Sequence, residues 1–233
     1  MSEQSISDHQ ILYEDNHLIA VWKEAGVLVQ GDQTGDKSLT DSLGKFLKEK
    51  YQKPGNVFTG LIHRIDRPVS GLVIFAKTSK ALTRMNELFK ERKVKKTYWC
   101  IVEGRVEKKT DTLISYLKKD PVKNKARVSS KFKEGFKQAE LNYKSELILD
   151  RYTLLEVTPK TGRQHQIRAQ LASIGYPIKG DLKYGAKRSN KDGSISLHAR
   201  GLEFIHPVQN IPISIVAYLP DSEIWKRVNE ILQ

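Results

Sequence analysis

A chain of 233 residues is long enough to bury a sizeable core, in one large domain or two small ones. Its formal net charge of +13 favours a polyanionic partner, most commonly nucleic acid. The single cysteine, Cys100, excludes an intramolecular disulfide and a zinc finger, and we expect it in the core. With neither a signal peptide, nor a membrane-spanning stretch, nor a lipidation signal, we expect a cytoplasmic protein without a membrane partner.

The first half of the chain alternates between short strands and amphipathic helices. Apolar residues recur at helical spacing in two segments, and one uninterrupted apolar run predicts a strand buried on both faces. The predicted elements are a disordered tail at 1–9, strands at 11–14 and 17–23, a helix at 38–51, the buried strand at 72–76, and a helix at 79–92.

The second half is richer in strands, many of them joined by short turns. The predicted elements are strands at 97–102, 138–148, 152–158, 196–204 and 211–219, a short helix at 164–174, and a closing helix at 221–232 capped by Asp221 or Ser222. This pattern predicts an α+β fold with a largely antiparallel sheet. No internal repeat or long linker divides residues 10–233, so we expect one domain there.

A strongly basic segment lies between residues 105 and 137. It holds eleven Lys or Arg and four Asp or Glu, so more than half of the net charge of the chain is concentrated in it. Few large apolar residues occur there, which predicts a hairpin or a mobile loop. Such clustering favours contact with phosphates, although a solvated charged surface would explain it as well.

The segment from His63 to Gly71, with the sequence H-R-I-D-R-P-V-S-G, contains the strongest candidate for a reactive group. Asp66 lies between two arginines, on a predicted tight loop next to the buried strand, and scaffolds of this kind often carry reactive residues. Nearby guanidinium groups favour the ionised carboxylate, which can act as a nucleophile or a base. Taken alone, the same residues would also suit a polar surface turn.

A second motif, T-P-K-T-G-R-Q-H-Q-I-R, spans residues 158–168. Its Thr-Gly turn opens the predicted short helix and brings Arg163 and Arg168 within about one and a half turns. Arginines near the start of a helix can bind phosphate or pair with a carboxylate.

Together these residues resemble the RluA family of RNA pseudouridine synthases over nearly the whole chain, from about residue 10. Five blocks match in the order of the family, at 63–72, 96–104, 162–168, 175–185 and 197–207. The departures are Glu24 for Pro, Ile65 for Leu, Val69 for Thr, Gln164 for Thr, and Gln170 where many members have His. These differences leave the target uridine open.

The resemblance implies the pseudouridine synthase catalytic fold and an isomerase that converts uridine in ribosomal or transfer RNA to pseudouridine. It implies no cofactor and no metal. It also implies a chain without the separate N-terminal RNA-binding domain that many relatives carry, and we take a monomer as the simplest expectation. Binding of RNA then depends on the catalytic domain itself, in agreement with its positive charge.

The resemblance also implies roles for individual residues. Asp66 is the essential carboxylate, Arg168 pairs with it, and the ring of Tyr98 stacks on the uracil. Three routes stay open for Asp66, which are attack on the sugar, attack on the base, and removal of a sugar proton. The substrate-binding residues are expected to be Arg64, which fills the space of the flipped base, His63, which orients the loop, and Arg67, Arg163 and Ile167.

Three other classes of protein are alternatives to this prediction. A non-catalytic RNA-binding protein would share the charge but would not require Asp66, Tyr98 and Arg168 together. A metal-dependent phosphoesterase using His63, Asp66, His165 and His198 is disfavoured, because closely paired carboxylates are missing. A kinase is excluded by the absence of a glycine-rich loop with its accompanying motifs.

Overall fold

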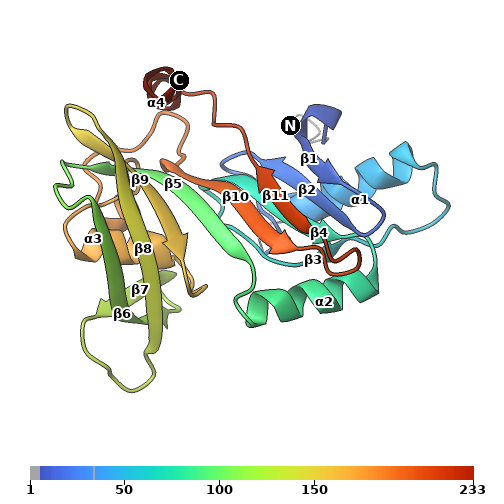
Figure 1. The fold of residues 1–233 in the computed structure, drawn as a ribbon, viewed down its shortest axis with the longest axis horizontal. Coiled ribbons are helices and arrows are strands. Elements are labelled where there is room, and N and C mark those ends of the chain that lie inside the picture. Colours follow the sequence, from blue (N-terminus) through green and yellow to red (C-terminus); the bar gives the residue numbers. More distant parts are fainter. Residues whose placement is uncertain (1–5, 34) are drawn as a thin grey trace. The chain divides into compact units, whose positions relative to one another are not determined.

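A computed structural model describes residues 6–33 and 35–233, which form two compact units (Figure 1). Of the described residues, the first unit comprises 6–33, 35–95 and 199–220, and the second comprises 96–198 and 221–233. Of the tail predicted at 1–9, residues 1–5 lie outside the described part, while Asp8–Gln10 form a short 3-10 helix. Among the described helices, none combines the length and the apolar character that crossing a membrane requires.

The first unit is built on a sheet in which β1 (Ile11–Glu14), β2 (Leu18–Lys23), β4 (Ser70–Ala76) and β10 (Leu197–Ile205) lie in this order. Strand β2 pairs antiparallel with β1 and with β4, β3 (Gly60–Leu61) pairs with β4, and β11 (Pro212–Val216) pairs with β10. Every residue of β4 is buried, which confirms the strand that the apolar run predicted. This rigid strand directly follows the loop that carries Asp66.

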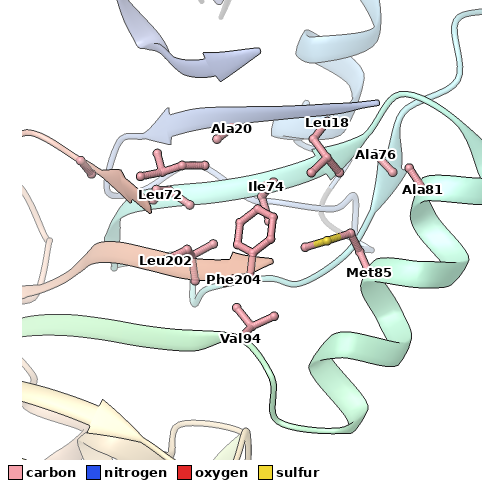
Figure 2. Close-up of a cluster of buried hydrophobic side chains, with 12 residues drawn as sticks. Leu18, Ala20, Leu72, Ile74, Ala76, Ala81, Met85, Val94, Leu202 and Phe204 are labelled. Carbon is pink, nitrogen blue, oxygen red and sulfur yellow. The ribbon is translucent and has the colours of Figure 1, made fainter. Parts of the chain in front are cut away.

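The core of the first unit lies between this sheet and helix α2 (Ser79–Lys90) (Figure 2). Leu72 and Ile74 of β4 and Phe204 of β10 meet Ala81 and Met85 of the helix, all of them buried. The helix begins at its N-cap Thr78, whose side chain accepts a hydrogen bond from the backbone of Ala81.

Helix α1 (Leu39–Lys50) belongs to the same unit and begins with a capping box. The side chain of Ser38 accepts the backbone N–H of Asp41, and the Asp41 carboxylate accepts the backbone N–H of Ser38. Leu39, Leu43 and Leu47 form its buried face, as the helical periodicity predicted.

The second unit contains an antiparallel array of strands in which β5 (Lys95–Glu103), β9 (Tyr152–Pro159), β8 (Lys137–Ile148), β6 (Thr110–Asp120) and β7 (Lys125–Ser129) follow in spatial order. All four of its pairings are antiparallel, which confirms the predicted α+β class with a largely antiparallel sheet. The basic segment forms the hairpin β6–β7, one of the two conformations expected for it.

One face of this antiparallel array is covered by helix α3 (Gln166–Ser173) and the 3-10 helix η2 (Leu182–Tyr184) (Figure 1). Ala169 and Tyr184 pack against Leu117, Ala126 and Ala139 of the strands. The end of the chain forms helix α4 (Glu223–Leu232), in which Trp225 and Val228 are buried.

Two details of the predicted helices are wrong. Helix α3 begins at Gln166 instead of residue 164, because His165 has a left-handed backbone conformation with φ of +51° that interrupts the helix. At the start of α4, Ser222 has the backbone position of an N-cap, but its side chain makes no capping hydrogen bond, and Asp221 forms an ion pair with Lys226 instead.

Candidate active site

The predicted site residues are distributed over both units, and the environment of each is clear within its own unit. Asp66, with His63, Arg64 and Arg67, belongs to the first unit. The remaining predicted site residues belong to the second unit, and they are Tyr98, Arg163, Ile167 and Arg168.

Asp66 lies on a tight turn immediately before β4. The backbone N–H of Val69 donates to the carbonyl of Asp66 over 3.0 Å and closes the turn. Ile65 and Val69 are buried on either side, so the half-buried carboxylate is carried by a backbone that is anchored in the core at both ends. This is the placement that the sequence predicted for a reactive group on a rigid scaffold.

A second loop, which contains Gly26, holds the Asp66 turn through Arg67, the residue that follows Asp66. The carbonyl of Arg67 accepts the N–H of Gly26 over 2.7 Å, and the Arg67 side chain returns a hydrogen bond from Nε to the carbonyl of Gly26 over 2.9 Å. Its Nη2 forms an ion pair with Asp36 at 2.8 Å. Arg67, a predicted substrate-binding residue, thus also fastens the Asp66 turn to residues 26–36.

Lys23, at the end of β2, supports the same turn from within the core. Its side chain is wholly buried, and Nζ donates to the carbonyls of Glu24, Val27 and Arg67 over 2.8, 2.9 and 3.2 Å. Burial lowers the pKa of Lys23 to about 7, although the negative charge of Asp66 acts in the opposite direction. Lys23 is therefore a buried amine whose charge state is coupled to the candidate carboxylate.

His63 and Arg64 occupy opposite environments on the same loop. Nε2 of His63 accepts the backbone N–H of Ile74 over 3.2 Å, and the ring stacks on Phe89 with centroids 5.2 Å apart. His63 therefore connects the loop to β4 and α2, as expected for a residue that orients the loop. Arg64 is exposed to solvent.

Tyr98 and Ile167 are presented by regular elements of the second unit. Tyr98 is half-buried on β5, in register with the buried Val157 of β9. Ile167 lies in the first turn of α3 and is almost fully buried.

Arg168, one residue further along α3, is buried as a salt-bridged ion. Its Nε and Nη2 donate to the two carboxylate oxygens of Asp181 over 2.6 and 2.9 Å, and neither side chain is more than 5% exposed. The guanidinium carbon also lies 5.1 Å from the ring centroid of Tyr184. A bidentate partner and an aromatic ring together fix the plane of the guanidinium.

The loop before α3 is fixed to β8. Gln166 accepts hydrogen bonds from the backbone of Arg163 over 3.0 Å and from the hydroxyl of Thr161 over 2.7 Å, and it donates to the carbonyl of Glu140 over 3.0 Å. The exposed side chain of Arg163 donates from Nε to the carbonyl of Gln138. The predicted arginines thus differ, since Arg163 faces solvent and Arg168 is buried.

The hairpin β6–β7 has an ordered turn despite its many charges. The carboxylate of Asp120 accepts the backbone N–H groups of Val122 and Lys123, and it binds Arg127 through Nε and Nη2. These hydrogen bonds lower the pKa of Asp120, and the bond from the backbone N–H of Lys123 has the largest effect. Lys118, Lys119 and Lys123 are exposed to solvent.

Sequence reasoning missed Lys23, Asp181 and Tyr184 as residues that support the site. All three occur in segments compared with the family, so their position in those segments was the available signal.

In the described part of the chain, no three His, Cys, Asp or Glu side chains are grouped so that they could hold a metal ion. His165, a residue of the alternative phosphoesterase site, instead lies 3.0 Å through Nδ1 from the hydroxyl of Tyr184.

Comparisons with known proteins identify the class. A family model described as RNA pseudouridylate synthase matches residues 17–173. The chain is 34% identical over 231 residues to ribosomal large subunit pseudouridine synthase C of Buchnera aphidicola from Acyrthosiphon pisum, covering 96% of this chain and 71% of that protein. It is 32% identical over 237 residues to tRNA pseudouridine synthase C of Vibrio parahaemolyticus, covering 94% and 93%.

Solved structures show the same fold. Human RNA pseudouridylate synthase domain containing 4 superposes with a TM-score of 0.78 at 23% identity, covering 93% of this chain and 91% of that one. The human domain containing 1 gives a TM-score of 0.68 at 20% identity, with coverage of 96% and 94%. The fold is thus that of a pseudouridylate synthase domain.

Because the family model covers well over half of its length, the chain belongs to the RNA pseudouridylate synthase family. It is therefore an isomerase that acts on RNA, and the resemblance inferred from its motifs is confirmed.

Proposed function

We propose that this enzyme converts specific uridines of ribosomal or transfer RNA into pseudouridine, with Asp66 as the essential carboxylate. The observation that carries the proposal is the construction of the Asp66 turn. Its backbone is fixed by Val69, by Gly26 and by the buried amine of Lys23. Relatives named for ribosomal RNA and for transfer RNA support both substrate classes.

Asp66, Tyr98 and Arg168 are the proposed catalytic residues. The glycosidic bond to N1 of uracil breaks, the base turns, and C5 is joined to the sugar. Asp66 acts as an ionised group on the sugar or on the base, which are the routes left open above. Tyr98 stacks on the uracil, and Arg168 stabilises the negative charge of the carboxylate. The fixed guanidinium of Arg168 suits this task, because it is oriented before substrate arrives.

The target nucleotide reaches the site by leaving its stack, at a cost of about a few kcal/mol. Arg64, which is exposed, takes the vacated position and stacks there through its planar guanidinium. His63 orients the loop, while Arg67, Arg163 and Ile167 contribute to the binding of the nucleotide. The exposed lysines of the hairpin β6–β7 contact phosphates of the RNA.

The same proposal includes a monomeric protein that requires no metal and no other cofactor. Action on ribosomal or transfer RNA implies a cytoplasmic location, and relatives from bacteria support it.

The test is the release of tritium from RNA labelled at C5 of uridine. We expect Asp66→Asn to abolish release, because an amide can neither attack nor accept a proton as the carboxylate does. Asp150→Asn, at an exposed position of the same residue type, serves as the matched control and should release tritium normally. Normal release by Asp66→Asn would remove Asp66 from the mechanism.

Binding of RNA is measured on the same proteins over a range of salt. Asp66→Asn should bind with unchanged affinity, and log affinity should fall with log salt by about 0.7 for each phosphate contacted on single-stranded RNA. Binding without any tritium release by the unaltered protein would indicate a binding protein instead of an enzyme.

A further inference from the structure

The contacts of Arg168 form a chain that leads to the basic hairpin. Arg168 is held along one edge by Asp181 and lies over the ring of Tyr184, three residues later on η2. An aromatic face attracts a guanidinium and limits its tilt. Asp181 and Tyr184 therefore fix the guanidinium of Arg168 in two different directions.

The hydroxyl of Tyr184 connects this arrangement to strand β7. It accepts the backbone N–H of Ala126 over 2.7 Å, and Nδ1 of His165 lies 3.0 Å away. Ala126 is buried, so this hydrogen bond is shielded from water. A single side chain thus touches both Arg168 through its ring and the hairpin through its hydroxyl.

Two glutamines join the hairpin to the same region. Nε2 of Gln164 donates to the side-chain oxygen of Asn124 in the hairpin turn over 2.8 Å. Nε2 of Gln170 donates to the carbonyl of Leu113 and the hydroxyl of Ser115, both on β6. Gln164 and Gln170 are two of the positions at which this chain departs from the family pattern given above.

We propose that Tyr184 is a positioning residue through which the basic hairpin β6–β7 holds the guanidinium of Arg168 in its working orientation. The hairpin would then serve the chemical step as well as the binding of RNA. This inference deepens the proposed function and rests on it, because it assigns to the RNA-binding element a part in setting a catalytic residue.

The variant that tests it is Tyr184→Phe, which removes the bond to Ala126 and leaves an aromatic ring beside Arg168. Hydrogen exchange followed by NMR reports both ends without any RNA. We expect the Ala126 amide and the Nε–H of Arg168 each to exchange about fivefold faster, as the loss of one hydrogen bond predicts. Tyr218→Phe is the control, since its hydroxyl donates to the carbonyl of His9 over 3.3 Å and belongs to the first unit.

Faster exchange at Ala126 with no change at the Nε–H of Arg168 would overturn the inference, because the tyrosine would then secure the hairpin alone. The hydrogen-exchange measurement does not depend on catalysis. If the unaltered enzyme formed no pseudouridine, the proposed function would fail while the exchange data still decided the role of Tyr184.

Kinetics supply the second arm. We expect Tyr184→Phe to lower kcat about fivefold while the Kd for RNA stays within about twofold, because the lysines of the hairpin remain in place. A raised Kd with unchanged kcat would show that the hydroxyl acts in binding only, and would also overturn the inference. Tyr184→Leu, which removes the ring as well, should lower kcat further than Tyr184→Phe.

Discussion

Position 71, the last of the Asp66 motif, requires glycine for a steric reason whose effect on stability can be measured. Its φ is +114°, and a Cβ built there would lie 2.3 Å from the carbonyl oxygen and 2.6 Å from the nitrogen of Ala199 on β10. Ordinary Cβ contacts begin near 3.4 Å, so β4 and β10 would have to separate by about 1 Å. Both atoms belong to backbone, and no side-chain rotation can relieve the overlap.

We expect Gly71→Ala to destabilise the protein by about 2–5 kcal/mol, of which positive φ contributes about 1–2 and overpacking about 1–3. Gly55→Ala is the matched control, because Gly55 has a similar φ of +82° but nothing within 4 Å of a Cβ. The control should lose only the φ contribution of about 1–2 kcal/mol. Urea unfolding with linear extrapolation measures both variants.

If the two variants differed by less than about 1 kcal/mol, the steric argument would be refuted, since backbone strain alone would then explain Gly71. Turnover gives a second comparison. Gly71 lies five residues after Asp66, so its alanine variant should lose tritium release even under conditions where it stays folded. Gly55→Ala should retain it.

Two further predictions concern pH. Burial would raise the pKa of Glu14, but hydrogen bonds from Lys77, Tyr51 and Lys50 outweigh it and lower the pKa to about 2. The shifted pKa of Glu14 contributes at most about 3 kcal/mol to the free energy of unfolding. This contribution is present above the unfolded pKa and is lost as the pH falls from about 4.5 towards 2, and Glu14→Gln should remove that pH dependence. Lys23 is the opposite case, because the unfolded state binds more protons between the pKa of about 7 in the folded protein and the ordinary lysine value of 10.5. Stability should therefore rise with pH across that window, by at most about 5 kcal/mol, and Lys23→Met should abolish the rise, as unfolding curves at each pH would show.

The sequence predicted the main strands and helices because their signals are local. The buried strand β4 has an unbroken apolar run, and α1 and α2 have apolar faces at helical spacing. The start of α3 was wrong for an equally physical reason. His165 is compatible with a helix by propensity, but it adopts a left-handed conformation near the hydroxyl of Tyr184, nineteen residues away. A tertiary contact of this kind leaves no trace in local periodicity.

For the candidate site as well, local motifs predicted some residues, while others became apparent only in the fold. Motif comparison predicted Asp66, Tyr98 and Arg168, because each lies in a block whose residue types are specific. Lys23 was missed, since a lysine at the end of a strand is usually solvated. Only the fold shows that its amine is buried against the carbonyl of Arg67, forty-four residues further along the chain. Supporting residues depend on long-range geometry, and the sequence alone does not supply it.

The buried pair of Arg168 and Asp181 is better explained by position than by stability. Desolvating two charges can cost as much as their attraction returns, so apolar residues of similar volume would often serve a core equally well. Here a cation is retained on a helix whose residues from Gln166 to Leu171 are all buried. What the carboxylate adds is direction, because it binds two nitrogens of a planar group that also lies over Tyr184. For the catalytic role proposed for Arg168, a guanidinium that Asp181 and Tyr184 already hold in place needs no reorganisation when charge develops in front of it.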